Sequence, residues 1–326
     1  MNILVVGLGS MGKRRIRLLK GICPNCPVYG VDVSSERREQ VEKDFKIKTE
    51  ATLDMALENF YPDCVIVSSS PLSHSSIIKK CLNKGCHVFS ELNLIADDYE
   101  VLEKTARTKK KVLFLSSTFL YRKEIEYIDK VVTSSSHKIN YTYHVGQYLP
   151  DWHPWENIDN YFVSNKRTNG CRELFAIELP WLIKVFGKIV NFKVSKSKNS
   201  SLNVNYPDNY MVMLEHENGN KGLFSVDIIS RKAVRKLEVY NDELYLSWDG
   251  SPHGLFVYDY ENKADMKINL YDSVEQNSKY ASFIIENAYQ SELESFFSEI
   301  NGIKSSRYSF TDDVVTLNLI DRFEEC

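Results

Sequence analysis

The chain has 326 residues, enough for two domains, and its 43% hydrophobic and 26% charged residues are ordinary usage for a globular protein. A formal net charge of −3 provides no basic field for nucleic acid, and no apolar run reaches the roughly eighteen residues of a membrane span. The first residues also lack the charged lead and cleavage site of a signal peptide. We therefore expect a cytoplasmic protein with a small-molecule partner, and neither nucleic acid nor a membrane as partner.

The chain opens with a short apolar strand over residues 3–6 that runs into a glycine-rich turn and a basic helix. The turn reads Gly7-Leu8-Gly9-Ser10-Met11-Gly12. Gly7 permits a tight turn, Gly9 lets the backbone approach a pyrophosphate, and Gly12 lets helix and strand pack closely. The helix N-terminus, at Ser10 and Met11, supplies N–H groups and the positive end of a dipole for the phosphates. The pattern predicts a dinucleotide-binding domain.

A second strand begins at Val28, and its carboxylate Asp32 follows Gly12 by twenty residues. Dinucleotide-binding domains place the acid that holds the adenosine ribose at this distance. Arg37 and Arg38 open the next helix and would tolerate a 2′-phosphate, whereas Asp32 would repel one, so we expect NAD, with NADP as the alternative. In the other interpretation Asp32 caps a helix in an ordinary α/β domain, and both arginines are solvated.

The same order of strand, polar loop and helix continues to about residue 120. Strands are predicted over 64–67, 86–89 and 112–116, with helices over 75–83 and 97–108 between them. Together these elements indicate about six parallel strands in a doubly wound Rossmann sheet. We therefore predict a dinucleotide-binding domain over residues 1–120.

From residue 121 the pattern changes to longer strands in which apolar and polar residues alternate. These strands are predicted over 140–147, 209–216, 222–229, 236–240 and 244–248, which is typical of an open, mainly antiparallel sheet. Helices are predicted over 170–186, 286–301 and 312–323, and a surface loop over 193–205. We therefore predict a second α/β domain, for substrate binding and oligomerisation, over residues 121–326.

A segment rich in aromatic rings and hydrogen-bonding groups runs from Tyr143 to Glu156. Aromatic rings stack on sugar faces while polar side chains bind hydroxyls, so we expect this segment to contact a carbohydrate. The candidates are Gln147, Tyr148, Trp152 and His153. His153 is also the first acid/base candidate, because an ordinary histidine exchanges a proton at a pH of about 6.5. The alternative assigns these aromatic residues to the core or to a subunit interface.

Two groups of basic residues follow the aromatic segment: Lys166, Arg167 and Arg172 in the first, and Arg231, Lys232 and Arg235 in the second. Cations beside a sugar site would fit an anionic substrate such as a uronate, a nonulosonate or a sugar nucleotide. Arg167 and Arg172 are our substrate-binding candidates. Ordinary surface charge is the alternative.

Seven cysteines, an odd number scattered through the chain, predict free thiols in a reducing compartment. Cys23 and Cys26 form the single C-x-x-C pair, which we interpret as a loop feature in preference to a zinc or redox site, because no second pair accompanies it. Neither His144 nor His153 lies at metal-ligand spacing from cysteine or carboxylate residues, so no metal is predicted.

Three stretches together resemble the Gfo/Idh/MocA family of NAD(P)-dependent sugar and cyclitol oxidoreductases: the glycine turn, Ser70–His74 and Gly85–Glu91. The likeness spans essentially the whole chain. It implies a Rossmann domain followed by an α/β domain whose open sheet mediates oligomers, here a homo-oligomer. It also implies that the nicotinamide half of the cofactor is contacted by Ser69, Pro71, His74 and Glu91.

The chain departs from the family at the residues that move protons. After the glutamate that Glu91 matches, the family continues with Lys-Pro, and its lysine lies beside the nicotinamide and the reacting hydroxyl. Here those two positions hold Leu92 and Asn93. Leucine carries neither a proton nor a charge, so the usual relay cannot operate through it.

The second departure lies in the second domain, where the family has an aspartate and, four residues later, a histidine. The matching positions hold Glu173 or Leu174, and Ile177 or Glu178. Besides His153, the candidate acid/base groups are therefore Glu173 and Glu178, whose separation on a helix places them roughly on one side. Capping or ion pairing is the alternative role for both carboxylates.

Two functions follow from these observations. The first is an NAD(P)-dependent oxidoreductase that moves hydride between a nicotinamide and a sugar carbon with a non-standard acid/base. Within the family, the Trp152–Trp155 segment resembles members that serve surface-polysaccharide biosynthesis. The second, motivated by Leu92 and Ile177, is a non-catalytic dinucleotide-binding sensor or scaffold that kept the fold and lost the chemistry.

Overall fold

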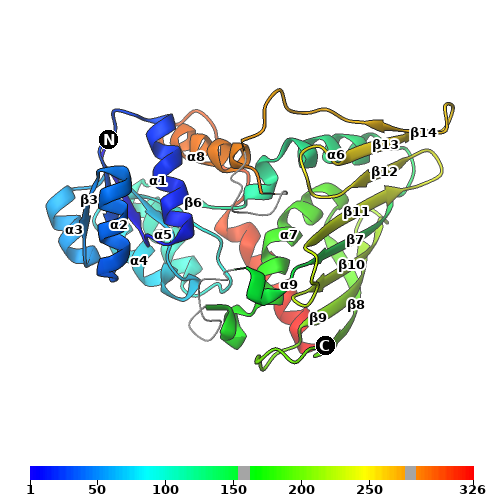
Figure 1. Ribbon diagram of the computed structural model, residues 1–326, viewed down its shortest axis with the longest axis horizontal. Coiled ribbons are helices and arrows are strands. Elements are labelled where there is room, and N and C mark those ends of the chain that lie inside the picture. The colour runs from blue at the N-terminus through cyan, green and yellow to red at the C-terminus, as the bar shows by residue number, and fades with distance from the viewer. Residues whose placement is uncertain (153–161, 276–283) are drawn as a thin grey trace. The chain divides into compact units, whose positions relative to one another are not determined.

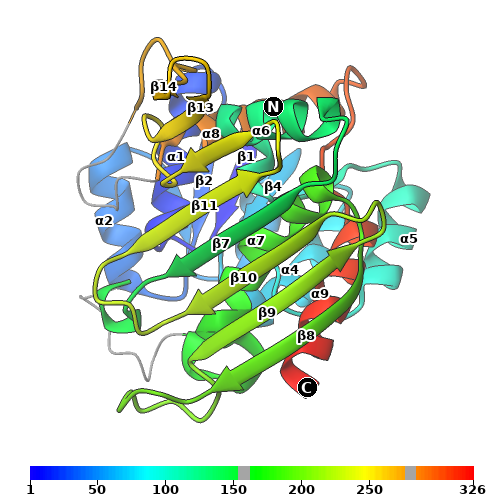
Figure 2. The same ribbon diagram turned by 90° about the vertical axis from the view of Figure 1, so that its right-hand side faces the viewer.

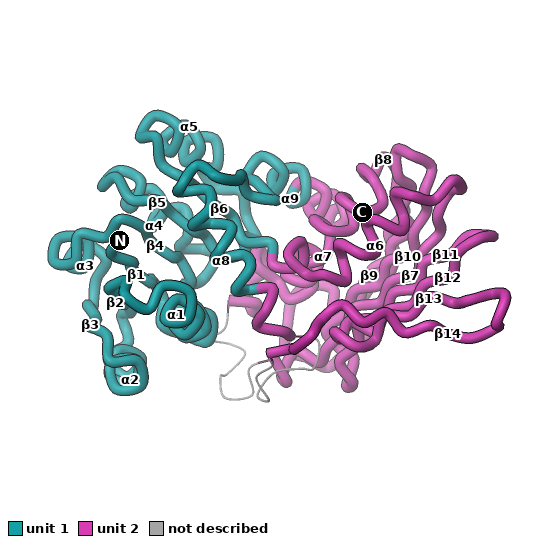
Figure 3. The backbone as a smooth tube through the Cα atoms, turned by 90° about the horizontal axis from the view of Figure 1, so that it is seen from above, with its two compact units in different colours: residues 1–117, 289–317 teal, residues 118–288, 318–326 magenta. Residues whose placement is uncertain are grey.

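The computed structural model describes residues 1–152, 162–275 and 284–326, and these form two compact units (Figures 1 and 3). Unit 1 comprises Met1–Ser117 with Tyr289–Leu317, and unit 2 comprises Thr118–Ala288 with Asn318–Cys326. Unit 1 contains a parallel sheet of six strands and unit 2 a mainly antiparallel sheet of eight. The predicted α/β fold class is therefore confirmed.

The sheet of unit 1 has the strand order β3-β2-β1-β4-β5-β6, and every neighbouring pair is parallel. Its strands are β1 (Ile3–Val6), β2 (Val28–Val31), β3 (Lys48–Glu50), β4 (Cys64–Val67), β5 (His87–Ser90) and β6 (Leu113–Leu115). All residues of β1 and β4 are buried apolar side chains, the continuous pattern of strands that are covered on both faces. Strands β1 to β3 are added on one side of this point and β4 to β6 on the other, so the strand order reverses between β1 and β4. Ligands of doubly wound sheets bind beyond the carboxyl ends of the strands at such a switch point.

Five helices alternate with these strands: α1 (Ser10–Ile22), α2 (Ser35–Phe45), α3 (Leu53–Phe60), α4 (Pro71–Asn83) and α5 (Tyr99–Lys109). The side chains of Ser34 and Thr52 cap α2 and α3 by accepting a backbone N–H. By contrast, no side chain caps α1, whose N-cap residue is Gly9. The N–H groups of its first turn therefore face a position where a ligand would take the place of a cap.

Residues 289–317 pack into unit 1 although they follow most of unit 2 in the sequence. They belong to α8 (Glu286–Ile300) and to the start of α9 (Phe310–Glu325). The ring of Phe296 lies 5.6 Å from that of Phe89 on β5 and 5.7 Å from that of Phe114 on β6. The predicted division at residue 120 does not anticipate this return, because the aromatic contacts join residues that are remote in the chain.

The sheet of unit 2 has the strand order β14-β13-β12-β11-β7-β10-β9-β8. Its strands are β7 (Asn140–Gly146), β8 (Ile189–Ser197), β9 (Asn209–His216), β10 (Lys221–Asp227), β11 (Val234–Tyr240), β12 (Tyr245–Trp248), β13 (Leu255–Asp259) and β14 (Ala264–Lys267). Only β7 and β10 pair in parallel. The surface loop predicted over 193–205 is wrong up to Ser197, because β8 is an edge strand without a fully buried residue and its composition resembles that of a loop.

One face of this sheet packs on helices of unit 2, chiefly α7 (Gly170–Phe186), and the other face is open, as Figure 2 shows. A further helix, α6 (Lys123–Ser134), and the short turns η1 (Thr118–Tyr121), η2 (Leu149–Asp151), η4 (Phe162–Ser164) and η5 (Lys166–Thr168) also belong to the described part of the unit. Alternation along β9 sends Tyr210, Val212 and Leu214 into the core and leaves Met211 and Met213 exposed. No helix in the described ranges is long and apolar enough to cross a membrane.

Candidate functional site

The three glycines of the turn after β1 meet three different steric requirements. Gly7 has a φ of +90°, and a Cβ there would lie 2.7 Å from the backbone of Ser68. A Cβ on Gly12 would lie 1.9 Å from the Gly7 carbonyl oxygen, so helix and strand approach too closely for any side chain. At Gly9 the nearest atom is Nη1 of Arg37, at 3.9 Å. Open space therefore exists at the one glycine whose expected task is to admit a diphosphate.

Asp32 lies at the end of β2, beside the same turn. Its Oδ2 accepts the Leu8 N–H at 2.8 Å, and its Oδ1 accepts the Ser34 N–H at 2.9 Å. Each carboxylate oxygen can accept a further bond, which leaves capacity for a ribose hydroxyl. Nη1 of Arg37 lies 3.8 Å from Oδ2, whereas Arg38 donates to the Asp32 carbonyl. Of the two arginines, Arg37 is therefore the one that lies between the acid and the glycine turn.

The loop after β4 adds a hydroxyl that the sequence analysis did not single out. Oγ of Ser68 is buried and has no hydrogen-bond partner among the described residues, and its backbone adjoins Gly7. A buried polar atom without a partner is a candidate for a ligand contact. The hydroxyl of Ser69, which we did predict, lies 2.8 Å from that of Ser73, and Pro71 begins α4. No local signal distinguishes Ser68 from the neighbouring serines, because its burial depends on the packed turn.

His74 and Glu91 point into the interior of unit 1. His74 is 2% exposed and both of its ring nitrogens have hydrogen-bond partners. Nε of Arg15 lies 2.5 Å from Oε1 of Glu91, and Arg15 also binds Glu292 at 2.7 Å. The two side chains therefore hold the cofactor domain together, and direct contacts from them to a cofactor, as predicted, do not fit this arrangement.

The two residues after Glu91 differ in exposure. Asn93 is 2% exposed, whereas Leu92 is partly exposed at the carboxyl end of β5. The position that matches the family lysine therefore presents an apolar side chain at the edge of the sheet where cofactors of this fold bind.

In unit 2, Glu178 is completely buried. Its Oε1 accepts two bonds from Arg235, at 2.6 and 3.0 Å, and its Oε2 accepts bonds from Tyr143 and Trp181 at 2.7 and 2.6 Å. Four donors saturate the carboxylate, so the predicted catalytic role of Glu178 is wrong for this arrangement. Its side of α7 faces the sheet, which helix spacing alone could not reveal.

Arg172 is likewise structural. It is 5% exposed, and it binds Glu324 and Asp321 on α9, each at 2.7 Å. The predicted contact with an anionic substrate is therefore wrong, since two carboxylates already balance its charge. Arg167, on η5, is exposed.

Glu173 is the predicted acid/base residue whose surroundings suit proton transfer. It lies in the first turn of α7, is half-buried, and its Oε2 has no hydrogen-bond partner among the described residues. Burial raises the pKa of Glu173 to about 8. A carboxyl group of this kind is protonated at neutral pH and can both give and take a proton near it.

Residues 147–152 of the aromatic segment form a turn after β7 in which three predicted residues are partly exposed. They are Gln147, Tyr148 and Trp152. The indole Nε1–H of Trp152 donates to the Gln147 carbonyl oxygen at 3.2 Å, and the guanidinium of Arg231 lies 3.6 Å from the centre of the Tyr148 ring. One cation of the second basic group thus meets the aromatic segment. His153 lies outside the described residues.

Cys23 and Cys26, in the loop between α1 and β2, form a disulfide, so the prediction of free thiols is wrong for this pair. Five other cysteines are free, and four of them are buried. Within residues 1–152, 162–275 and 284–326, no three His, Cys, Asp or Glu side chains are arranged to hold a metal ion.

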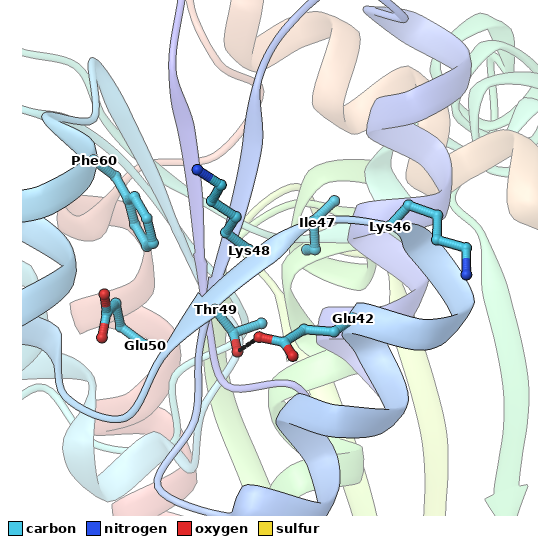
Figure 4. A pocket seen from close by; sticks show the side chains of 7 residues that line it. All are labelled: Glu42, Lys46, Ile47, Lys48, Thr49, Glu50 and Phe60. Atoms are coloured by element: carbon cyan, nitrogen blue, oxygen red, sulfur yellow. Dashed lines mark hydrogen bonds between the residues drawn. The ribbon is translucent and has the colours of Figure 1, made fainter.

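Two hollows mark the surfaces of the units. One, of about 480 Å³, lies at the edge strand β3 and is lined by Glu42, Lys46, Ile47, Lys48, Thr49, Glu50 and Phe60 (Figure 4). It includes none of the predicted cofactor residues, and Glu42 accepts a hydrogen bond from Thr49 across it. The other, of about 520 Å³, is a groove on the open face of the unit 2 sheet.

Comparison with known proteins yields one family match. A family model for oxidoreductases with an NAD-binding Rossmann fold matches residues 1–117. The match covers the glycine turn, Asp32 and the loop after β4. The predicted resemblance to Gfo/Idh/MocA oxidoreductases is therefore confirmed over residues 1–117.

Several solved structures are similar over nearly the whole chain at low identity. UDP-N-acetylglucosamine 3-dehydrogenase GnnA from Acidithiobacillus ferrooxidans has 14% identity and a TM-score of 0.72, with 100% of this chain and 96% of that chain covered. The WlbA dehydrogenase from Chromobacterium violaceum, in complex with NADH and UDP-GlcNAcA, has 12% identity and a TM-score of 0.77, with 99% and 92% covered.

Biliverdin reductase from Synechocystis, in complex with biliverdin and NADP⁺, has 14% identity and a TM-score of 0.77, with 99% of this chain and 98% of that chain covered. The three proteins act on or bind different molecules. At these identities the likeness establishes the fold of both units, and the substrate has to be argued from the residues of this chain.

Proposed function

We propose, for a chain whose first 117 residues belong to the Gfo/Idh/MocA oxidoreductase family, that the protein is an NAD(P)-dependent oxidoreductase acting on a sugar derivative. The observation that carries the proposal is the open space at Gly9 beside an uncapped helix N-terminus. A bound nicotinamide would supply the hydride chemistry. The turn from Gly7 to Gly12 would bind the diphosphate of the cofactor, and Asp32 would bind its adenosine ribose. Ser68 and Ser69 would contact the nicotinamide half of the cofactor.

We propose NAD as the preferred cofactor. If Asp32 binds the adenosine ribose as proposed, a 2′-phosphate would lie close to its carboxylate, and like charges at close range repel. Arg37, at 3.8 Å, offsets part of this repulsion, so NADP binds more weakly but is not excluded. Titrating the protein with NADH and NADPH measures the preference, and a higher affinity for NADPH would contradict it.

For the substrate we propose an anionic sugar, either a uronate or a sugar nucleotide, with a role in surface-polysaccharide biosynthesis. Support comes from the partly exposed Tyr148 with Arg231 over its ring, from Gln147 and Trp152 in the same turn, and from the exposed Arg167. Of the similar structures, GnnA is named as a UDP-N-acetylglucosamine dehydrogenase, and WlbA was solved in complex with UDP-GlcNAcA. Turnover of neutral cyclitols but not of UDP-sugars would contradict this choice.

Glu173 is the acid/base that we propose in place of the family lysine and histidine. In the direction of reduction, a bound nicotinamide would supply the hydride to the carbonyl carbon, and the Glu173 carboxyl would give its proton to the carbonyl oxygen. In oxidation the carboxylate takes that proton back from the hydroxyl. His153 stays a second candidate from the sequence.

Replacing Glu173 by glutamine is expected to lower kcat/KM by about 10² to 10³, the usual contribution of one acid/base group. In the wild type, reduction should slow as pH rises through about 8, because the raised carboxyl pKa keeps the acid protonated below that value. The variant should lose this slope. Glu215→Gln, an exposed carboxylate on β9, is the control. An unchanged pH profile in Glu173→Gln would exclude Glu173.

A non-catalytic dinucleotide-binding protein is the second candidate, favoured by the partly exposed Leu92 and Ile177 at two positions where the family moves protons. A comparison of the wild type with Leu92→Lys separates the two functions. For an enzyme we expect the wild type to oxidise or reduce a UDP-sugar, followed by nicotinamide absorbance. Activity confined to the Leu92→Lys variant would support the sensor or scaffold, and a wild type that bound no nicotinamide would contradict both.

We also propose a cytoplasmic homo-oligomer that forms through the open sheet of unit 2. Met211, Met213 and Leu223 are 60%, 56% and 52% exposed there, and large exposed apolar patches mark interfaces. The groove of about 520 Å³ runs across these strands. The five free cysteines suit a reducing compartment, although the Cys23–Cys26 disulfide does not. Light scattering after gel filtration measures the assembly, and a monomer at micromolar concentration would contradict it.

A further inference from the structure

The ring of His74 is held between two polar partners in unit 1. Its Nε2 lies 2.9 Å from the Ser69 carbonyl oxygen, and its Nδ1 lies 2.6 Å from Oδ1 of the Asn93 side-chain amide. Burial lowers the pKa of His74, although both hydrogen bonds and the charge of Glu91 act in the opposite direction. The imidazole is therefore neutral at neutral pH.

A neutral imidazole has one donor and one acceptor nitrogen. The Ser69 carbonyl can only accept, so Nε2 carries the proton and Nδ1 must receive a hydrogen bond. As the amide is placed, Oδ1 faces Nδ1, while Nδ2 is buried without a hydrogen-bond partner among the described residues. Turning the amide over makes Asn93 the donor to Nδ1. The amide oriented with Nδ2–H toward Nδ1 satisfies both groups, and the ring tautomer decides this orientation.

This chain of hydrogen bonds ends at the candidate cofactor site. Ser69 follows Ser68, whose backbone adjoins Gly7 and whose buried Oγ has no partner in the described ranges. The Ser69 carbonyl is fixed by the bond from His74, so the loop after β4 cannot move without breaking that bond. Asn93 thereby acts on the loop from the carboxyl end of β5, although it does not contact the glycine turn.

We propose that Asn93 is a positioning residue for the dinucleotide, which acts through His74 to hold the Ser69 carbonyl and so presents Ser68 to the cofactor. The proposal rests on the proposed nicotinamide binding and adds to it. Where the resembling family has proline, no side-chain amide exists. The positioning of the Ser69 carbonyl by Asn93 through His74 is therefore a feature of the Leu92-Asn93 sequence of this chain.

The test uses two substitutions at one position in the full chain. Asn93→Ala removes the donor to Nδ1. Asn93→Asp replaces it by a carboxylate, which can bind Nδ1 only when the ring carries protons on both nitrogens. The charged and titratable groups around the ring are Glu91, which is paired with Arg15, and beyond the amide Tyr99, which is bonded to Asp313.

Calorimetric titration with NADH should give three patterns. The wild type should show an affinity that does not depend on pH between about 7 and 8.5, because the lowered pKa keeps His74 neutral there. Asn93→Ala should bind about tenfold more weakly at every pH, the cost of leaving a buried acceptor unpaired. Asn93→Asp should approach wild-type affinity at the acid end and weaken as pH rises and the ring loses its second proton.

Asn220→Ala is the matched control, since Asn220 in unit 2 is also buried and its Nδ2 donates to the Phe186 carbonyl. It should lower thermal stability and leave NADH affinity unchanged. Wild-type affinity in Asn93→Ala, or a pH-independent affinity in Asn93→Asp, would overturn the positioning role while the proposed function stands. A wild type that bound no NADH would overturn the proposed function and this inference together.

Discussion

Arg235→Met is expected to lower the free energy of unfolding by about 3 to 5 kcal/mol, because removing one partner of a buried ion pair leaves the other charge without compensation. Glu178 is completely buried, and two of the four bonds to its carboxylate come from Arg235. Tyr143 and Trp181 donate the other two and do not carry a positive charge. Urea unfolding followed by tryptophan fluorescence measures the loss.

The neighbouring residue provides a control for this prediction. Lys236 pairs with Glu238 at 2.9 Å on the open face, and its side chain is 63% exposed. Lys236→Met should therefore change stability by less than about 1 kcal/mol, as exposed pairs do. The double variant Arg235→Met with Glu178→Leu should recover much of the loss, since no unpaired charge is then left buried. Equal losses in Arg235→Met and Lys236→Met would contradict the buried-pair interpretation.

Gly9→Val is expected to weaken NADH binding by about 100-fold, which corresponds to about 2.7 kcal/mol of binding free energy. The added side chain would occupy the space in which the backbone approaches the diphosphate. Folding should be little affected, because the Gly9 φ of −70° suits any residue and the nearest atom to a Cβ is 3.9 Å away. Calorimetric titration measures the affinity, and thermal unfolding checks the fold.

Gly21→Val is the matched control, since Gly21 lies near the other end of α1 and a Cβ there would meet no atom within 4 Å. It should leave NADH affinity unchanged. If Gly9→Val bound NADH as the wild type does, the glycine turn would not be the diphosphate site, and the proposed oxidoreductase would lose its main support.

The sequence by itself determined the features that depend on neighbours in the chain. Strand β1, the glycine turn and the start of α1 are contiguous, and the backbone requires glycine at Gly7, with its positive φ, and at Gly12, against the Gly7 carbonyl. The six residues Gly7–Gly12 were therefore enough to predict the arrangement. The alternation of side chains likewise predicted the open sheet, and α7 has the predicted bounds Gly170–Phe186. These patterns are periodic, and the period is a property of the backbone.

Only the tertiary structure decided which charged residues are available for chemistry. Glu178 and Glu173 lie on the same helix and both carry a carboxyl group, yet one is saturated by Arg235, fifty-seven residues away, and the other has an unpartnered oxygen among the described residues. Arg172, Glu91 and His74 are likewise engaged by partners that the fold brings to them. A carboxylate's role depends on its burial and on hydrogen-bond donors from distant parts of the chain, and the neighbouring residues in the sequence determine neither.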